Sequence, residues 1–216
     1  MTWFSLVAAL SLWLKLCSVS TALYFGSFNP PHKGHEGILQ ELHSRYAFDE
    51  ICLVLSPQNP MKGKSDLSEE IRLDMVRHWT DSLPFVNCSD IEFEMERPSY
   101  TYLTLRRFRE KFPETPFAVV MGMDSFVQLH RWRNYEEIVR NHKFYVYPRE
   151  GYSLSAEEVP VLREFPRTEV VWMDAPLFPY ASSLIRQALQ QGKDVSDQVP
   201  EAVWTYIKKH SLYQKS

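Results

Sequence analysis

Residues 26–35 read Gly26-Ser27-Phe28-Asn29-Pro30-Pro31-His32-Lys33-Gly34-His35. The segment follows an apolar run at residues 22–25 and precedes an amphipathic segment that starts near Glu36. This order predicts a strand, a tight glycine turn and the start of a helix, which is where α/β proteins bind phosphate groups. The two histidines can donate hydrogen bonds to phosphate oxygens, and the helix dipole favours an anion at the same place. Two surface histidines capping an ordinary helix are the alternative, which leaves the glycine turn and the prolines unexplained.

The composition indicates a soluble globular chain. Of its 216 residues, 44% are hydrophobic and 24% are charged, which suits one domain with a sizeable core. The net charge is −3 and no block of like charges occurs, so we expect no nucleic-acid partner. The composition does not decide the oligomeric state, and a homo-oligomer remains open.

The cysteines indicate a reducing compartment. Cys17, Cys52 and Cys88 have neither Cys-x-x-Cys spacing nor a nearby histidine, which argues against a disulfide scaffold and a zinc site. We therefore expect a cytoplasmic protein.

The first twenty residues differ from the rest of the chain. Residues 3–14 are apolar, but no basic residue precedes them, no small-x-small cleavage pattern follows, and they are too short for a membrane span. We expect residues 1–20 to be an artefactual or disordered extension and residues 21–216 to form a single domain, with no membrane association. An export or membrane signal and a packed helix are the alternatives.

Apolar runs alternate with helical patterns along the remaining chain. Strands are predicted at residues 23–25, 51–56, 86–91, 117–121, 143–147 and 170–173. Helices are predicted at residues 34–45, 68–80, 102–111, 125–129, 135–140, 182–190 and 200–210. This alternation predicts an α/β fold: a parallel sheet with helices on both faces and a C-terminal helical cap from about Ser182. Residues 148–166 are expected to cross the surface, with room for a short helix.

Two further segments with polar side chains follow predicted strands, where an α/β sheet binds ligands. Residues 56–64 read Ser-Pro-Gln-Asn-Pro-Met-Lys-Gly-Lys and place Lys62 as a point charge for phosphate. Residues 98–101 read Pro-Ser-Tyr-Thr and bring the Tyr100 ring and the Thr101 hydroxyl to a helix start. An exposed loop and plain helix caps are the structural alternatives.

Two more segments complete the set. After the fourth strand come Gly122, for close backbone approach, and Asp124, which can cap the next helix and accept hydrogen bonds from a sugar; Trp132 follows with a flat face for stacking. Residues 182–186 read Ser-Ser-Leu-Ile-Arg, a second helix start suited to phosphate. A core tryptophan and serine caps with a surface arginine are the alternatives.

In this order, the segments resemble those of bacterial nicotinate-nucleotide adenylyltransferases, members of the His-x-Gly-His nucleotidylyltransferase superfamily. The resemblance runs from about Ala22 to the last helix and implies a Rossmann-like domain. It also implies ATP and nicotinate mononucleotide as substrates, in NAD biosynthesis, with Mg²⁺ carried by the ATP phosphates and no protein metal ligands. Three departures occur: Asn29 replaces the commoner aspartate, Ala181 replaces a serine, and no histidine precedes Lys62.

The resemblance also implies site residues. His32, His35 and Arg186 would be catalytic, and Lys62, Tyr100, Thr101 and Trp132 would bind the acceptor. The ATP contacts would be Gly26, Ser27, Phe28, His32, His35, Gly122, Asp124, Ser182, Ser183 and Arg186.

The motif contains no activated nucleophile, so the acceptor phosphate is expected to attack the α-phosphorus of ATP directly. Two rival functions remain open. The first is the same transfer to another acceptor, such as nicotinamide mononucleotide, phosphopantetheine or glycerol phosphate. The second is a non-catalytic nucleotide-binding protein, which would bind ATP without releasing pyrophosphate.

Overall fold

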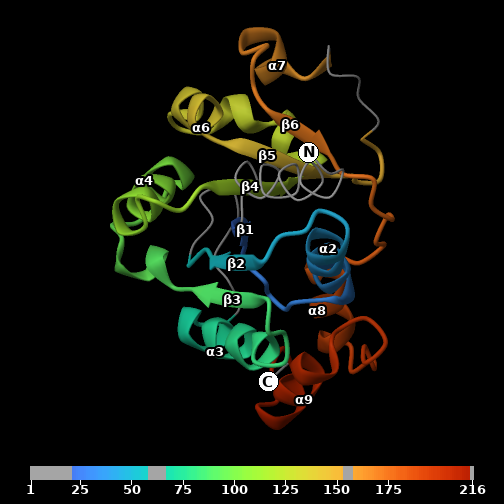
Figure 1. The fold of residues 1–216 in the computed structure, drawn as a ribbon. Helices are drawn as coiled ribbons and strands as arrows, with labels where there is room; N and C mark the ends of the chain where they lie inside the picture. Colours follow the sequence, from blue (N-terminus) through green and yellow to red (C-terminus); the bar gives the residue numbers. More distant parts are fainter. Residues whose placement is uncertain (1–20, 58–66, 153–157, 215–216) are drawn as a thin grey trace, which may run out of the picture.

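Strand β1 (Thr21–Gly26) lies at the centre of a six-stranded sheet in a computed structural model that describes residues 21–57, 67–152 and 158–214. β1 pairs in parallel with β2 on one side and with β4 on the other, and all remaining pairs are also parallel. The order β3-β2-β1-β4-β5-β6 is the Rossmann arrangement, with its switch point between β1 and β4 (Figure 1). The other strands are β2 (Glu50–Leu55), β3 (Val86–Ser89), β4 (Phe117–Gly122), β5 (Lys143–Tyr147) and β6 (Val170–Trp172).

Both faces of the sheet are covered by helices. Alternate side chains of β1 enter different clusters: Ala22 and Tyr24 belong to one core, and Leu23 belongs to the other. The first core is closed by buried residues of α2 (Lys33–Ser44), α3 (Glu69–Thr80), α8 (Ser182–Gln190) and α9 (Glu201–Lys209). The second is closed by α4 (Thr101–Lys111), α5 (Met123–Val127), α6 (Tyr135–Asn141) and α7 (Pro160–Glu164). Burial on both faces explains why the strands read as continuous apolar runs.

The predicted α/β fold is therefore confirmed, and the predicted strands and helices all occur with small shifts at their ends. Helix α7 is the short helix that the sequence analysis allowed within residues 148–166. One boundary was wrong: β3 ends at Ser89 instead of residue 91, and the 3₁₀ helix η1 (Ile91–Glu94) follows. The Ser89 hydroxyl accepts a hydrogen bond from the Ile91 amide at 3.3 Å, and this local turn competes with further strand pairing. A second 3₁₀ helix, η2 (Leu129–Arg131), follows α5.

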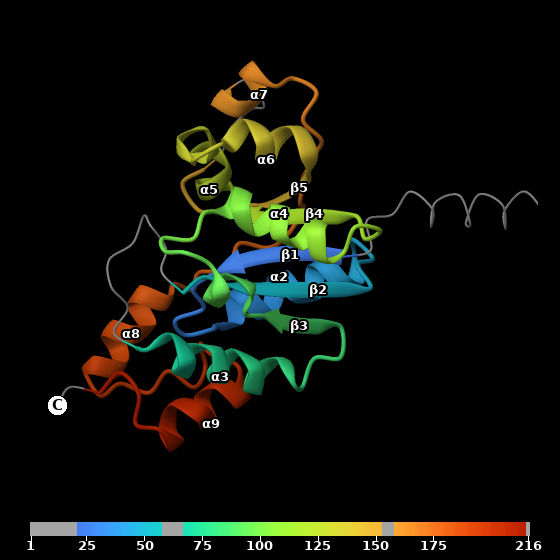
Figure 2. The same ribbon diagram turned by 90° about the vertical axis from the view of Figure 1, so that its left-hand side faces the viewer.

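The C-terminal helices form the predicted cap and hold the glycine turn that follows β1. Helix α9 lies beside α3, as Figures 1 and 2 both show. Figure 2 also shows that the arrowhead of β1 points to the side of the molecule on which α8 lies. After α9, the Tyr213 hydroxyl donates to Oδ1 of buried Asn29 at 2.6 Å. The end of the described chain thus supports the loop between β1 and α2.

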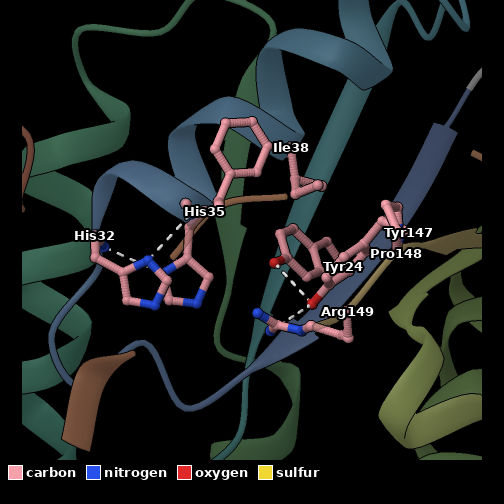
Figure 3. Close-up of a pocket in the computed structure, with 9 residues that line it drawn as sticks. Tyr24, His32, His35, Ile38, Tyr147, Pro148 and Arg149 are labelled. Atoms are coloured by element: carbon pink, nitrogen blue, oxygen red, sulfur yellow. Dashed lines mark hydrogen bonds between the residues drawn. The ribbon is translucent and has the colours of Figure 1, made fainter. Parts of the chain in front are cut away.

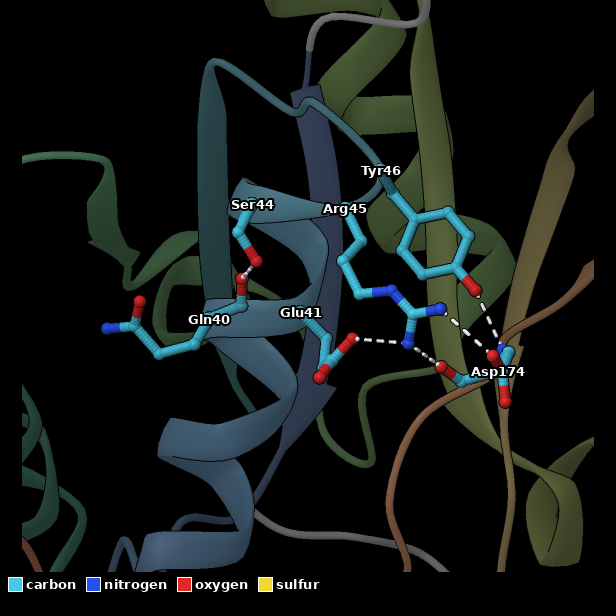
Figure 4. Close-up of polar contacts among 6 residues, drawn as sticks. All are labelled: Gln40, Glu41, Ser44, Arg45, Tyr46 and Asp174. Carbon is cyan, nitrogen blue, oxygen red and sulfur yellow. Dashed lines mark hydrogen bonds and ion pairs between the residues drawn. The ribbon is translucent and has the colours of Figure 1, made fainter.

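The opposite end of α2 is fixed by polar contacts to the segment after β6 (Figure 4). Arg45 forms an ion pair with the Asp174 carboxylate at 2.9 Å, and it also pairs with Glu41 at 3.2 Å. The Asp174 amide donates to the Tyr46 hydroxyl at 2.7 Å. These exposed contacts orient the helix more than they stabilise it, because surface ion pairs contribute about 0–1 kcal/mol. Among the described residues, none of the helices combines the length and the apolar character that a membrane span needs.

We expect Tyr213→Phe to lower the free energy of unfolding by about 1–3 kcal/mol, since it removes a hydrogen-bond donor from buried Asn29. For a chain of this length that corresponds to a fall in Tm of about 2–4 °C per kcal/mol. Thermal unfolding measures the change, with Tyr206→Phe, a half-buried hydroxyl on α9, as the matched control. Equal Tm values for the two variants would contradict the assigned bond.

Candidate functional site

The loop from β1 to α2 turns sharply and ends in a reciprocal cap. Phe28 has a positive φ of 43°, and His32 is the extended N-cap residue of α2. The His35 amide donates to Nδ1 of His32 at 3.3 Å, and the His32 amide donates to Nδ1 of His35 at 3.1 Å. Two histidines therefore play the parts that a serine and a glutamate usually play in a capping box.

This cap fixes the orientation of both imidazoles. The rings are stacked, with centroids 3.6 Å apart and planes 18° apart. Because each Nδ1 accepts a hydrogen bond, the proton of each neutral ring must lie on Nε2. Figure 3 shows both Nε2 atoms on the same side of the stacked pair. The helix start thus carries two parallel N–H donors.

Apolar groups hold the imidazole pair from behind. The Phe28 ring is 1% exposed and packs edge-on against His35, with centroids 5.0 Å apart. Gly34 leaves room for the same stack, since a Cβ there would lie 3.0 Å from Nδ1 of His32 and 3.2 Å from Cβ of Phe178. The space above Gly34 is therefore taken by these two side chains.

The surroundings of His32 favour its neutral form. Burial, and to a smaller extent the nearby positive charge of Arg149, lower the pKa of His32 from 6.5 to about 4. At neutral pH the residue is therefore an uncharged N–H donor, not a cation.

Arg149, at the carboxyl end of β5, is the main site residue that the sequence analysis missed. Its guanidinium donates to the Tyr147 hydroxyl at 3.1 Å, and that hydroxyl also accepts from Tyr24 at 3.3 Å. Burial raises the pKa of both phenols, so both stay neutral. Figure 3 shows this trio beside the histidine pair, around a cavity of about 10 Å³, roughly the room of one water molecule. Any larger ligand must lie over this pocket. The missed signal was the place of Arg149 directly after a strand, within residues 148–166, which we had assigned to the surface.

Gly122 and Asp124 lie next to Arg149. Nε of Arg149 is 3.6 Å from Oδ1 of Asp124, and a Cβ on Gly122 would lie 2.4 Å from the same oxygen. A side chain at position 122 would therefore clash with the Asp124 carboxylate in this arrangement. The prediction that Asp124 caps the next helix was wrong, because Gly122 is the N-cap of α5 and Asp124 makes no capping bond. Its carboxylate is instead held toward Arg149.

The start of α8 joins the same loop. The Ser182 hydroxyl donates to the Pro30 carbonyl at 3.0 Å, and Arg186 donates to the Asn29 carbonyl at 2.8 Å. Ser183 is exposed at the same helix start. The structure therefore brings the loop that carries Gly26, Ser27 and the histidine pair together with the C-terminal segment.

The predicted acceptor residues lie at the starts of two neighbouring segments. Tyr100 and Thr101 open α4, and Trp132 follows η2; all three are half-buried. Arg133 lies over the Tyr100 ring at 4.9 Å from its centroid, which brings the two segments into contact. Tyr100 and Trp132 also pack on the second core, so each has a structural role as well. Lys62 lies outside the described residues.

The site is rich in hydrogen-bond donors for phosphate and poor in metal ligands. In the parts of the chain that the structure describes, no group of three or more His, Cys, Asp or Glu residues is placed to hold a metal ion. Together, the Rossmann arrangement and the paired imidazoles at a helix start define a nucleotide-binding α/β protein.

Comparison with known proteins narrows this class. A family model described as cytidylyltransferase-like matches residues 23–188. A Flavobacterium johnsoniae protein named "Probable nicotinate-nucleotide adenylyltransferase" is 41% identical over 195 residues, covering 89% of this chain and 98% of its own length. A Bacteroides fragilis protein of the same name is 36% identical over 193 residues, covering 89% of this chain and 92% of its own. The fold is shared with nicotinic acid mononucleotide adenylyltransferase from Plasmodium falciparum complexed with NaAD, at a TM-score of 0.73 and 22% identity, over 89% of this chain and 96% of that one. The chain therefore belongs to the cytidylyltransferase-like family and, within it, to the nicotinate-nucleotide adenylyltransferases.

The buried, neutral His32 generates a prediction about pH. Its pKa is about 4 in the folded chain and about 6.5 when unfolded, so the unfolded state takes up a proton first as the pH falls. His32 makes its full contribution to the free energy of unfolding above about pH 6.5. This contribution, about 3 kcal/mol, is lost as the pH falls from about 6.5 to about 4. His142, whose pKa burial also lowers, adds a loss in the same direction.

We expect His32→Asn to flatten this pH dependence, because asparagine preserves an N-cap acceptor but does not titrate. Denaturant unfolding between pH 4 and pH 7 measures the effect, with His43→Asn, an exposed position on the same helix, as the control. An unchanged slope in His32→Asn would show that another group carries the titration.

Proposed function

We propose that the protein transfers the adenylyl group of ATP to nicotinate mononucleotide, giving nicotinate adenine dinucleotide and pyrophosphate. The observation that carries this proposal is the stacked pair of Nε2–H donors at the helix start after β1. Membership of the nicotinate-nucleotide adenylyltransferases supports the choice of reaction and acceptor.

In the proposed reaction, a phosphate oxygen of the acceptor attacks the α-phosphorus of ATP, and the bond from that phosphorus to the pyrophosphate oxygen breaks. His32 and His35 donate from Nε2 to phosphate oxygens, which stabilises the negative charge of the transition state. These donors are fixed before the substrate binds, because backbone amides hold both rings. Catalysis then consists of positioning and charge stabilisation, without a covalent enzyme intermediate.

The remaining phosphate contacts are assigned to the start of α8. Ser182, Ser183 and Arg186 would hold the departing pyrophosphate, with Arg186 also tied to the glycine turn through Asn29. Gly26 and Ser27 supply backbone to the same phosphates, and Lys62 is proposed to reach phosphate from its loop. The absence of a carboxylate cluster in the described site fits Mg²⁺ that is carried by the ATP phosphates. Bound there, Mg²⁺ would neutralise phosphate charge.

The two nucleoside sites are assigned to different sets of residues. Gly122, Asp124 and Arg149 would bind the adenosine half of ATP, with the ribose hydroxyls donating to the Asp124 carboxylate. Tyr100, Thr101 and Trp132 would frame the pyridine ring. The Phe28 side chain supports His35 from below, so we propose that its backbone faces ATP.

The free thiols of Cys52 and Cys88 support our placement of this reaction in the cytoplasm. Pyrophosphate release from ATP tests the function directly, with nicotinate mononucleotide, nicotinamide mononucleotide, phosphopantetheine and glycerol phosphate compared side by side. Pyrophosphate release with only one of the other acceptors would identify that acceptor as the substrate. ATP binding without pyrophosphate release would indicate a non-catalytic protein.

We expect His35→Ala to lower kcat about a hundredfold or more, the scale for removing one fixed donor to developing charge. Steady-state pyrophosphate release measures the loss. His43→Ala, which changes a histidine at the far end of the same helix, is expected to keep its turnover. A folded His35→Ala protein with near-normal turnover would remove this residue from the mechanism.

Acceptor choice gives a second kinetic prediction. Nicotinate carries a carboxylate where nicotinamide carries an amide, and a site built from donors near Tyr100 and Thr101 leaves the amide N–H groups unpaired. We expect at least about a tenfold preference in kcat/KM for nicotinate mononucleotide, which corresponds to about 1.4 kcal/mol.

The stacking role assigned to Trp132 predicts that Trp132→Ala raises KM for the acceptor much more than KM for ATP. Trp204→Ala, a half-buried tryptophan on α9, is the control and should change neither constant. A Trp132→Ala defect confined to ATP would mean that the pyridine ring binds elsewhere.

A further inference from the structure

Arg72 is a buried arginine that ties two strand ends together. It lies on α3 with 1% of its surface exposed. Its guanidinium donates to the carbonyls of Ser27 at 3.0 Å and Ser56 at 2.9 Å, and also to that of Pro57. Ser27 belongs to the glycine turn after β1, and the other two residues directly follow β2. One side chain therefore sets the spacing between the ends of neighbouring strands.

Glu92 is a buried carboxyl group that fixes the start of α4. It lies in η1 with 2% of its surface exposed. It accepts hydrogen bonds from the hydroxyls of Ser99 at 2.7 Å and Thr104 at 2.8 Å. The Thr104 hydroxyl is also 3.3 Å from the carbonyl of Tyr100, the N-cap residue of α4. Glu92 thus anchors the segment that presents Tyr100 and Thr101.

Ser56 connects these two buried groups. Its carbonyl accepts from Arg72 at 2.9 Å, and its side chain makes a polar interaction with the Glu92 carboxyl group. A continuous chain of polar contacts therefore runs from the turn after β1, through the end of β2, to the start of α4. The first end belongs to the proposed ATP site and the last to the proposed acceptor site.

Stability alone does not account for this arrangement. The hydrogen-bond partners of Arg72 are carbonyls and those of Glu92 are hydroxyls, so neither group is neutralised by a hydrogen-bonded ion pair. Within the described residues, Nε of Arg72 has no hydrogen-bond partner. Apolar side chains of similar volume generally stabilise a core as well as buried charges do, whereas oriented polar bonds specify one geometry.

We propose that Arg72, Ser56 and Glu92 form a strut that sets the position of the ATP loop relative to the acceptor helix, which makes them positioning residues of the transfer reaction. This inference rests on the proposed function. The attacking oxygen must approach the phosphorus to about 3–3.5 Å, and a displacement of about 1 Å can lower the rate about a hundredfold. Breaking the strut should therefore lower kcat while each substrate still binds its own half of the site.

The test is a double-mutant cycle on kcat with Arg72→Met, Glu92→Gln and the double variant. We expect each single change to lower kcat at least about tenfold, with the Kd of ATP and of nicotinate mononucleotide, each measured alone, changed less than about threefold. Because either change opens the same strut, the double variant should be within about threefold of the worse single variant.

His142→Gln serves as the matched control. This buried polar residue precedes β5, at the edge of the sheet opposite the site. When His142→Gln is combined with either strut variant, the fold-change in kcat should be the product of the two separate fold-changes. Ser56→Ala removes only the side-chain link, so it gives the same kcat pattern if Arg72→Met fails to fold.

If the losses in kcat caused by Arg72→Met and Glu92→Gln multiply in the folded double variant, the two residues act independently. That result would overturn the proposed strut and leave the proposed function intact. A defect confined to the Kd of one substrate would overturn it as well, since it would indicate local support of one loop. A wild-type protein that releases no pyrophosphate with nicotinate mononucleotide would overturn the proposed function, and the strut with it.

Discussion

The reciprocal hydrogen bonds between backbone and imidazole at the start of α2 are the constraint on which the site depends. They use the two Nδ1 atoms as acceptors, stack the rings with their centroids 3.6 Å apart and place both Nε2 atoms on the same side of the pair. A helix start ordinarily satisfies its free amides with side chains that have no other task. Here the groups that cap the helix are the groups proposed to contact phosphate, so the stability of the helix and the fixed geometry of the proposed site have one origin.

This cap works only because the surrounding layers hold it. Phe28 packs edge-on against His35, and α8 and the segment after α9 bond to the preceding turn. The sheet contributes its carboxyl edge, where the ends of β1, β2, β4 and β5 deliver polar groups to one place. The sheet and the helices packed on it thus determine the geometry of the proposed site, and the loops add the remaining contacts.

Much of this could be predicted from the sequence, for an identifiable reason. The strands are apolar on both faces, so their runs stand out, and the segment from Gly26 to His35 predicts a phosphate site at the end of the first strand. What could not be predicted depends on contacts between distant residues. Three contacts follow from packing, which no local pattern records. Arg149 approaches Asp124, and Glu92 accepts hydrogen bonds from Ser99 and Thr104. Gly122, and not Asp124, is the N-cap residue of α5. The roles assigned to all the site residues, Ser183, Lys62 and Trp132 included, remain predictions.

The bond between Tyr213 and Asn29 has a consequence for how the protein is made. Its two residues are separated by 184 positions, so it closes nearly the whole described chain into one loop. The strands and helices near β1 can begin to assemble while the chain is still being synthesised, since their contacts are mostly closer in sequence. The turn that carries the histidines gets the support of Tyr213 only when that residue has left the ribosome. A nascent chain can therefore be folded over much of its length before its nucleotide loop is held in place.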